Sequence, residues 1–323
     1  AGQCGLWFHR AVTDLAAAHD DLRPLMFSVA YRMLGSVAEA EDVVQDAFLR
    51  MHRSMLAGSR PESPEAYATT VATRLAIDTL RSARHRRETY VGPWLPEPLV
   101  ESDAGDPAWQ IEMDETVSLA FLAVLERLSP VERAVFLLRD VFGYAYSDIA
   151  RVVGKSETNC RQQLLRARRH IDAARPRFEA RSEEHRTLTE RFLTAVRDGD
   201  VAGLERLLAD DVVFHADGGG KAPAIMEPLH GVTRVARFLT GLVRRGEPLG
   251  VRMEPALANG QPALRLLSTD GALLGVLGLE IVGGQVVALR NQINPDKLAH
   301  LGPVGDLNAL MAEGSSRKTL SGR

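Results

Sequence analysis

The chain has 323 residues, too many for one ordinary domain, so two or three separate cores are expected. Its composition, with 45% hydrophobic, 25% charged and 6% aromatic residues, is that of a globular protein and excludes a disordered or fibrous one. A net charge of −3, taken alone, argues against nucleic-acid binding, which needs clustered Lys and Arg. That average conceals one basic stretch over residues 155–181 and another over residues 81–87.

The two cysteines, Cys4 and Cys160, are far apart and have no neighbouring His or Cys at metal-ligand spacing. The sequence therefore predicts neither a disulfide framework nor a zinc site, and it fits a reducing compartment. No apolar run approaches the roughly 20 residues that span a bilayer, and the N-terminal stretch lacks the order of a signal peptide. We expect a cytoplasmic protein with no metal, no obligatory cofactor and no membrane partner.

The first predicted domain covers residues 19–87, where apolar residues recur every three or four positions as in helices. Gly35 is expected to end the first helix as its C′ residue. Ser36 then caps the second helix, and Glu39, three residues on, would complete a capping box. A loop rich in Gly and Pro precedes a third helix, which begins near Glu65.

A linker and a second helical domain follow. Over residues 88–114 the periodicity disappears and Pro, Gly and acidic residues accumulate, which is typical of a linker. Helical periodicity returns over residues 115–175, with breaks at residues 129–130, at Gly143 and at Gly154. These breaks leave short helices of the kind found in small DNA-binding bundles.

The segment over residues 146–168 has the pattern of a helix-turn-helix. Gly154 supplies the turn and Ser156 the cap of a second helix, whose buried side would be Cys160, Leu164 and Ala167. Arg and Gln side chains near the start of such a helix can discriminate bases by roughly 1–3 kcal/mol for each good pair. The alternative is a surface helix with a solvated charged face. The candidates for reading the DNA or holding its phosphates are Lys155, Ser156, Glu157, Asn159, Arg161, Gln162, Arg166 and Arg169.

The third predicted domain covers residues 185–300 and mixes helices with strands. Two helical segments precede strand-like runs separated by the dipeptides at 259–260, 270–271 and 283–284, which favour two-residue hairpin turns. One amphipathic helix over residues 232–243 interrupts this series. The order predicts a curved sheet wrapped on helices, an α+β domain, followed by a flexible tail over residues 301–323.

Two stretches carry a resemblance to a known family: FSVAYRMLGSVAEAEDVVQDAFLRMHR and LSPVERAVFLLRDVFGYAYSDIA, the latter running into the helix-turn-helix. They closely resemble the second and fourth conserved regions of extracytoplasmic-function sigma factors, in the right order and spacing from Asp20 to about Asp172. The resemblance implies a protein that is monomeric when free, binds the β′ and β subunits of core RNA polymerase, and directs it to the −35 and −10 elements of promoters.

The resemblance also implies roles for the first domain. The helix over residues 39–55 would dock on the clamp helices of the β′ subunit. The side chains presented for docking are Glu41, Asp42, Gln45, Asp46 and Arg50. The loop over residues 56–64 and the next helix match the part of the family that opens the −10 element. The candidates there are Tyr67, Thr70, Arg74, Arg81 and Arg84, although Tyr67 could equally be a core residue.

The linker is acidic, and its charge would suit the basic channels of polymerase. A merely solubilising role is the alternative. The carboxylates concerned are Glu97, Glu101, Asp103, Asp106, Glu112, Asp114 and Glu115.

The third domain resembles SnoaL-like members of the nuclear-transport-factor-2-like superfamily, cone-shaped α+β folds that enclose a pocket. Sigma factors of the SigJ-like group carry such an extension and share three short motifs. These stand here as Trp94, Leu95, Pro96, Glu97 and Pro98; as Asp217, Gly218, Gly219, Gly220 and Lys221; and as Asn294, Pro295, Asp296, Lys297 and Leu298. We expect the motifs to meet and the domain to regulate the sigma modules in cis, since tethering raises the effective concentration of weak contacts.

Other functions are less well supported by the residues. A nucleotide-binding P-loop at residues 217–221 is excluded by its spacing and by Ala222, which stands where Ser or Thr is needed. The third domain could instead be an enzyme or a ligand sensor, with His215, Asp217 and Glu280 as candidate bases, but no acid–base spacing singles out a reaction. A dimeric repressor would leave the sigma-like helices unexplained. The expected protein is therefore not an enzyme and has no catalytic or metal-ligating residues.

Overall fold

The computed structural model describes residues 20–59, 61–101, 115–174 and 183–312. These residues form two compact units. The helical unit contains residues 20–86 and 121–174. The tail unit contains residues 87–101, 115–120 and 183–312, so parts of the predicted linker belong to it.

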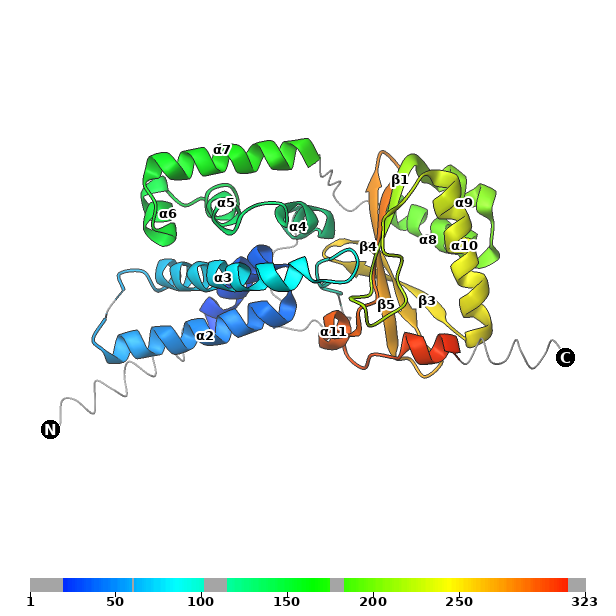
Figure 1. Cartoon of the computed structure of the whole chain (residues 1–323), viewed down its shortest axis with the longest axis horizontal. Helices are drawn as coiled ribbons and strands as arrows, with labels where there is room; N and C mark the ends of the chain where they lie inside the picture. The colour runs from blue at the N-terminus through cyan, green and yellow to red at the C-terminus, as the bar shows by residue number, and fades with distance from the viewer. Residues whose placement is uncertain (1–19, 60, 102–114, 175–182, 313–323) are drawn as a thin grey trace. The chain divides into compact units, whose positions relative to one another are not determined.

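The helical unit begins with a helix over residues 20–34, followed by α2 (Val37–Leu56) and α3 (Pro64–Glu88), which lie side by side in Figure 1. Gly35 has a φ of 64°, and the Ser36 side chain accepts a hydrogen bond from the Glu39 amide at 3.2 Å. The predicted helix end and N-cap are thus confirmed. The later elements of this unit are α4 (Leu119–Leu125), α5 (Pro130–Phe136), η3 (Leu137–Val141), α6 (Tyr146–Val153) and α7 (Glu157–Ala174). The short η2 (Glu115–Val117), which precedes them in the chain, belongs to the tail unit.

The helix-turn-helix is formed by α6 and α7, as the sequence predicts. Gly154 ends α6 with a φ of 66°, a left-handed conformation that glycine adopts without steric cost. The Ser156 hydroxyl then accepts a hydrogen bond from the Asn159 amide at 3.2 Å and caps α7. The predicted core residues of α7 are buried: Cys160, Leu164 and Ala167.

The tail unit is a six-stranded sheet with the order β2-β1-β6-β5-β4-β3. All neighbouring strands are antiparallel except β1 and β6, which are parallel. Asn259 and Gly260 have φ values of 53° and 71°, which the predicted Asn-Gly hairpin turn requires. The elements are α8 (Glu183–Asp198), α9 (Val201–Leu207), β1 (Leu208–Asp217), β2 (Leu229–His230), α10 (Val232–Gly246), η4 (Glu247–Leu249), β3 (Arg252–Ala258), β4 (Gln261–Leu267), β5 (Leu273–Val282), β6 (Gln285–Gln292), α11 (Pro295–Leu298) and η5 (Ala299–Leu301).

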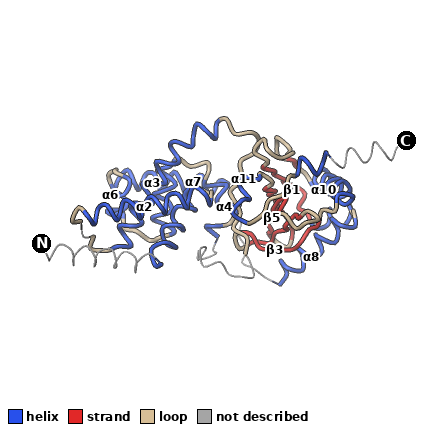
Figure 2. Tube along the Cα trace, turned by 90° about the horizontal axis from the view of Figure 1, so that it is seen from below, coloured by secondary structure: helices blue, strands red, loops and turns tan. Residues whose placement is uncertain are grey.

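The two faces of this sheet are covered differently. Helices α8, α9 and α10 lie on one face (Figures 1 and 2), where Phe192, Phe214 and Leu239 belong to the main hydrophobic core. A smaller core, which includes Val276 and Leu298, lies beside α11. The tail is thus an α+β domain whose interior, between helices and sheet, is filled by apolar side chains.

Two segments are more ordered than the sequence predicts. Leu95 and Leu99, in the predicted linker, are 5% and 4% exposed, because this segment packs on the tail. The predicted flexible tail from residue 301 includes Val304, which bridges Leu273 on β5, and a short helix over residues 307–312. In both places apolar side chains pack against the tail. The local composition of these two segments does not reveal that contact.

Within the described ranges, no helix is long and apolar enough to cross a membrane. The same residues contain no group of three His, Cys, Asp or Glu side chains placed to hold a metal ion.

Candidate nucleic-acid interface and linker clamp

The start of α7 presents a polar surface to solvent. Arg161 is exposed, donates to Glu157 at 2.9 Å, and its guanidinium carbon lies 4.6 Å from the centroid of the Tyr146 ring. These contacts hold the guanidinium near the turn of the helix-turn-helix. Lys155 and Gln162 are also exposed.

The basic side chains farther along α7 differ in their partners. Arg166 forms an ion pair with Glu132 of α5 at 3.2 Å. Arg168, which sequence reasoning did not select, donates twice to Asp140, at 2.8 and 2.7 Å. Arg169 is exposed and makes no ion pair with another described residue, so it is the more available of these cations for phosphate.

The candidate −10 residues lie on α3. Tyr67 and Thr70 are half-buried, and Thr70 donates to the Ala66 carbonyl at 2.8 Å. Arg74 is exposed and donates to the carbonyls of Arg151 and Val152 at 2.7 and 3.0 Å, at the end of α6. This cation satisfies helix C-terminal carbonyls, which carry partial negative charge.

Two further candidates lie at the end of α3. Arg81 is exposed and pairs with Asp78 at 3.4 Å. The side chain of Arg84 is outside the described residues.

The candidate polymerase-docking face is the exposed side of α2. Asp42, Gln45, Asp46 and Arg50 are exposed there, and Leu49 among them is 48% exposed. Glu41 is less exposed than these residues, because it is half-buried and accepts two hydrogen bonds from the Arg23 guanidinium, at 2.8 and 2.9 Å. An exposed apolar side chain within a polar face is suited to protein binding.

A buried arginine joins the two halves of the helical unit. Arg133 of α5 is 2% exposed, donates to the Met33 carbonyl at the end of the first helix, and pairs with Glu126 at 2.8 Å. Burial lowers its pKa from 12.5 to about 9. Nearby, the guanidinium carbon of Arg32 lies 5.7 Å from the centroid of the Phe142 ring. The sequence-based candidates did not include Arg133.

The three shared motifs meet around one buried carboxylate, Asp217 at the end of β1, which is 0% exposed. Its Oδ2 accepts hydrogen bonds from the Leu95 amide at 2.8 Å, from Lys297 Nζ at 2.7 Å and from Gln292 Nε2 at 3.3 Å. Its Oδ1 accepts from the Tyr90 hydroxyl at 2.5 Å. We call this cluster, formed by Tyr90, Trp94, Leu95, Asp217, Gln292, Asn294 and Lys297, the linker clamp.

Lys297 completes the linker clamp from the other side. Its Nζ also donates to the Leu95 carbonyl at 2.6 Å and lies 4.0 Å from the centroid of the Trp94 ring and 4.9 Å from that of Tyr90. Burial and the neighbouring Asp217 raise the pKa of Tyr90 above its usual range. The ion pair therefore holds both backbone polar groups of Leu95, while the two rings cover the cation.

The glycines of the second motif are explained by this packing. Gly219 has a φ of 57°, and a Cβ atom there would collide with the Asn294 side chain and lie 2.9 Å from the Tyr90 hydroxyl. The Asn294 side chain in turn donates to that hydroxyl at 2.9 Å. Lys221, at the end of the motif, forms an exposed ion pair with Asp296. All three motifs thus contribute to one set of contacts between residues 90–98 and the tail.

A second set of contacts fastens the segments on either side of residues 102–114. The Asn259 side chain, 0% exposed, accepts from the Leu99 amide at 2.9 Å and donates to the Val117 carbonyl at 2.8 Å. The Asn259 amide donates to the Leu99 carbonyl at 2.7 Å. Glu97 is 6% exposed, so this carboxylate of the acidic linker is buried. Asp103, Asp106, Glu112 and Asp114 lie outside the described residues.

We expect His300 to make the attachment sensitive to pH. Its Nε2 donates to the Pro98 carbonyl at 2.8 Å, and burial lowers its pKa below 6.5. The unfolded or released state therefore takes up the proton first as the pH falls, so the stabilisation is present above about pH 6.5 and is lost below it.

We expect hydrogen exchange of residues 94–101 to accelerate between about pH 7.5 and about pH 5, after correction for the intrinsic rate. In His300→Gln, which keeps a side-chain donor, this pH dependence should shrink. His230→Gln, at an exposed position on β2, is the control and should keep it. An unchanged pH profile in His300→Gln would contradict the assignment of this pH dependence to His300.

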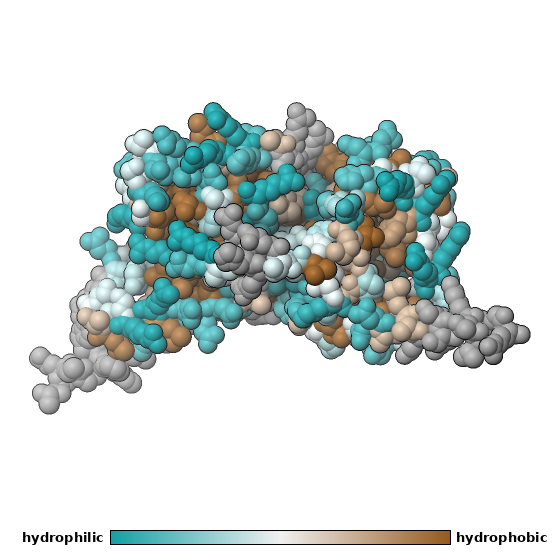
Figure 3. Space-filling model, viewed as in Figure 1, coloured by the Kyte–Doolittle hydropathy of each residue, from teal (hydrophilic) through white to brown (hydrophobic). Residues whose placement is uncertain are grey.

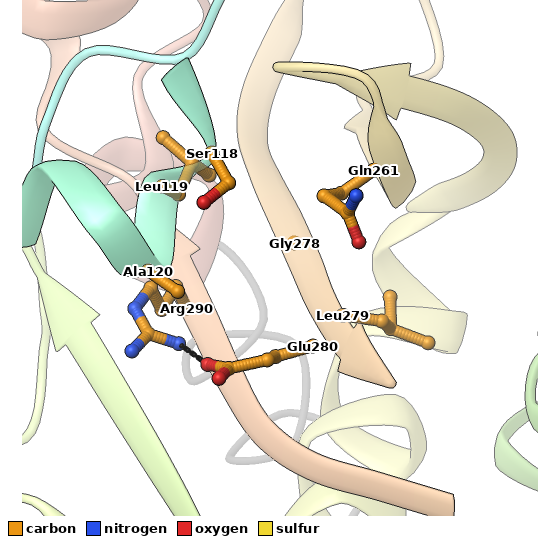
Figure 4. A pocket seen from close by; sticks show the side chains of 8 residues that line it. All are labelled: Ser118, Leu119, Ala120, Gln261, Gly278, Leu279, Glu280 and Arg290. Atoms are coloured by element: carbon orange, nitrogen blue, oxygen red, sulfur yellow. Dashed lines mark hydrogen bonds and ion pairs between the residues drawn. The ribbon is translucent and has the colours of Figure 1, made fainter. Parts of the chain in front are cut away.

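A small pocket is lined by side chains from β4, β5 and β6 and from residues 118–120 (Figure 4). Glu280 pairs there with Arg290 at 2.6 Å, and Leu119 lies close enough that a Cβ on Gly278 would approach its Cδ1 to 3.1 Å. The lining residues are Ser118, Leu119, Ala120, Gln261, Gly278, Leu279, Glu280 and Arg290. Residues next to the linker thus form one wall of this pocket.

The candidate bases of the tail are engaged in other contacts. Asp217 is used in the linker clamp and Glu280 in its ion pair with Arg290, while His215 is half-buried on β1. The arrangement does not bring these side chains together around an open pocket, and it offers no recognisable acid–base pair.

Several residues that hold the linker segments could not be selected from the sequence. Tyr90, Gln292, Asn259 and His300 lie outside the three motifs and have no distinctive spacing. The sequence indicates Asn259 only as a turn residue. Its buried side chain also bonds to the backbone of Leu99 and Val117.

Three family models match the chain. The family model for sigma-70 region 2 matches residues 19–86, that for sigma-70 region 4 matches residues 118–171, and that for the SnoaL-like domain matches residues 189–288. The ECF RNA polymerase sigma factor SigJ of Mycobacterium tuberculosis is 39% identical over 85% of this chain and 90% of its own length.

Two further similarities cover most of the chain. The probable ECF RNA polymerase sigma factor SigI of M. tuberculosis is 33% identical over 90% of this chain and 96% of its own length. The crystal structure of M. tuberculosis SigJ superposes with a TM-score of 0.72 at 34% identity, covering 88% of this chain and 98% of that one. The chain therefore belongs to the extracytoplasmic-function RNA polymerase sigma factors, and within them to the SigJ-like group that carries a C-terminal SnoaL-like domain.

Proposed function

We propose that this sigma factor uses the exposed face of α2 to bind the β′ subunit of polymerase, α3 to open the −10 element and α7 to read the −35 element, while its tail regulates these steps in cis. The docking role rests on the exposed polar face of α2 and on Leu49 within it. In the promoter complex Arg74 would exchange the carbonyls of Arg151 and Val152 for DNA phosphate.

We also propose that the protein is monomeric before it meets polymerase and acts in the cytoplasm, where the β and β′ subunits are found. Family membership supports these assignments, and the chain acts as a transcription initiation factor.

The roles assigned to α7 predict two different defects. Arg161→Ala should relax base preference at one position of the −35 element by about 1–3 kcal/mol, because base-edge contacts discriminate between sequences. Arg166→Ala should weaken binding to all sequences alike and reduce the salt dependence, because contacts with phosphate do not discriminate between base sequences. Competition binding of the polymerase holoenzyme to promoter variants measures both effects. An unchanged base preference in Arg161→Ala would show that Arg161 does not read a base of the −35 element.

The regulatory role of the tail rests on one observation: the linker clamp holds the backbone of the segment between the two sigma modules through a buried ion pair. Asn259 fixes the chain again at Leu99 and at Val117. Only residues 102–114 lie between the two fastened segments, so the reach between the DNA-reading modules depends on whether the tail holds or releases the linker.

Truncations test this role in promoter-directed transcription with core polymerase. A chain ending before Asn294 loses Lys297 and the clamp, whereas a chain ending after Leu298 keeps the clamp but loses His300. We expect these two truncations to transcribe differently from each other and from the full chain. If every truncation that keeps residues 1–181 transcribes like the full chain, the tail does not regulate in cis.

A further inference from the structure

Helix α10 of the tail exposes a stripe of basic side chains. Its buried face consists of Val235, Ala236, Leu239 and Thr240, which pack into the main core. On the opposite side of α10, residues spaced three or four positions apart lie next to one another along the outer side of the helix. We call the four exposed side chains there the arginine stripe: Arg234, Arg237, Arg244 and Arg245. Figure 3 shows hydrophilic residues, mixed with more apolar ones, on the side of the tail where α10 lies.

The charges of the arginine stripe are not neutralised within the described residues. The sequence of α10 contains no Asp or Glu, and none of the four guanidinium groups makes an ion pair with another described residue. Within the part of the chain that the structure describes, one of the four makes a side-chain hydrogen bond: Arg245 Nε donates to the Gly241 carbonyl at 3.1 Å.

Two other exposed arginines on the helices of the tail are neutralised, whereas Arg191 and Arg197 on α8 make no ion pair with a described residue. Arg186 on α8 pairs with Glu183 and with Glu190, and Arg206 on α9 lies 3.9 Å from Asp200. The arginine stripe is a local excess of positive charge because its four cations lie on one helix that contains no acidic residue.

Helix stability does not account for this pattern. Cations are favourable near the C-terminus of a helix, which explains Arg244 and Arg245. They are unfavourable near the N-terminus, yet Arg234 stands in the first turn of α10, where no acidic residue is present, and Arg237 follows one turn later. Like charges three residues apart also repel each other. An anionic partner outside the domain would offset these costs.

We propose that the arginine stripe binds the phosphate backbone of duplex DNA and gives the tail a DNA contact of its own. Arg234 and Arg245 are eleven residues apart, which is about 16 Å at the rise of an α-helix. Duplex DNA carries one negative charge for each 1.7 Å or so of its axis, so several phosphates face such a stripe. Guanidinium groups bind phosphate in a bidentate manner, and backbone contacts carry no base preference. This contact goes beyond the regulation of the linker and does not depend on it.

The test measures binding of the full chain to a fluorescein-labelled duplex without promoter sequence, by fluorescence anisotropy over a range of salt concentrations. Arg234→Gln together with Arg237→Gln removes two charges from the half of α10 where they do not stabilise the helix. Arg186→Gln together with Arg206→Gln is the matched control, since it removes two exposed charges that already have carboxylate partners.

Each phosphate contact contributes about 0.9 to the slope of log affinity against log salt, so the α10 variant should lose about 1.8 from that slope. The control should keep the slope of the unaltered chain. An unchanged slope in the α10 variant, or an equal loss in both variants, overturns the proposal. So does an α10 variant that binds DNA normally and loses affinity for core polymerase, because the stripe would then bind an acidic protein surface.

Discussion

Replacing Lys297 by Met is expected to weaken the hold of the tail on residues 90–98 by about 3–5 kcal/mol, because it leaves the Asp217 carboxylate buried without its counter-ion. Asp217 is 0% exposed and the Lys297 side chain 9% exposed, so water cannot replace the lost cation without opening the site. Hydrogen exchange at the Leu95 amide, which donates to Asp217, should accelerate on the order of a hundredfold or more.

Two further variants separate the buried pair from a general effect of charge. Lys221→Met removes the same charge from the exposed pair with Asp296, and it should cost no more than about 1 kcal/mol. Combining Asp217→Asn with Lys297→Met removes both buried charges and should restore much of the lost protection, since no uncompensated ion remains. Equal acceleration in Lys297→Met and Lys221→Met would show that the buried pair does not hold the linker.

Replacing Arg133 by Met is expected to destabilise the helical unit by about 3–5 kcal/mol. Arg133 is fully enclosed, and its removal takes this cation from the partly buried Glu126 carboxylate and this donor from the Met33 carbonyl. Met has a similar length and fills most of the space. The lost free energy of unfolding therefore comes mainly from the missing polar contacts and less from a cavity. Urea unfolding of the full chain, followed by the helical circular dichroism signal, measures the change.

Arg151→Met provides the comparison for Arg133. The Arg151 side chain is 80% exposed and pairs only with Asp148 in its own helix, so its loss should change the free energy of unfolding by less than about 1 kcal/mol. The backbone carbonyl of Arg151, which accepts from Arg74, is unaffected by this substitution. If Arg133→Met is as stable as Arg151→Met, the contact between α5 and the first helix is not a source of stability.

The helix-turn-helix shows which parts of the fold can be predicted from the sequence. Gly154, Ser156 and the buried Cys160, Leu164 and Ala167 act within one or two helical turns, so their spacing alone predicts α6, the turn and α7. The hairpin turn at Asn259-Gly260 is equally local, because its φ values of 53° and 71° suit Asn and Gly.

The candidate sites are predictable only in part. The exposed residues of α2 and α7 follow from helical periodicity, although their roles stay predictions. The contacts of Arg74 with Arg151 and Val152 could not be expected, because 77 and 78 residues separate the partners and each is ordinary in its own segment. The parallel pairing of β1 with β6 escaped prediction for the same reason.

The sequence by itself determined the order of the modules, the sigma-like helices and the α+β character of the tail, because these depend on local periodicity, capping and turn chemistry. It also marked the three shared motifs without showing what their residues do. Only the tertiary structure decided that Leu95 and Lys297, 202 residues apart, meet at Asp217, and that Tyr90, Gln292 and Asn259 join them. Burial and hydrogen-bond partners are set by segments distant in the chain, and no local pattern records which segment will cover a given carboxylate.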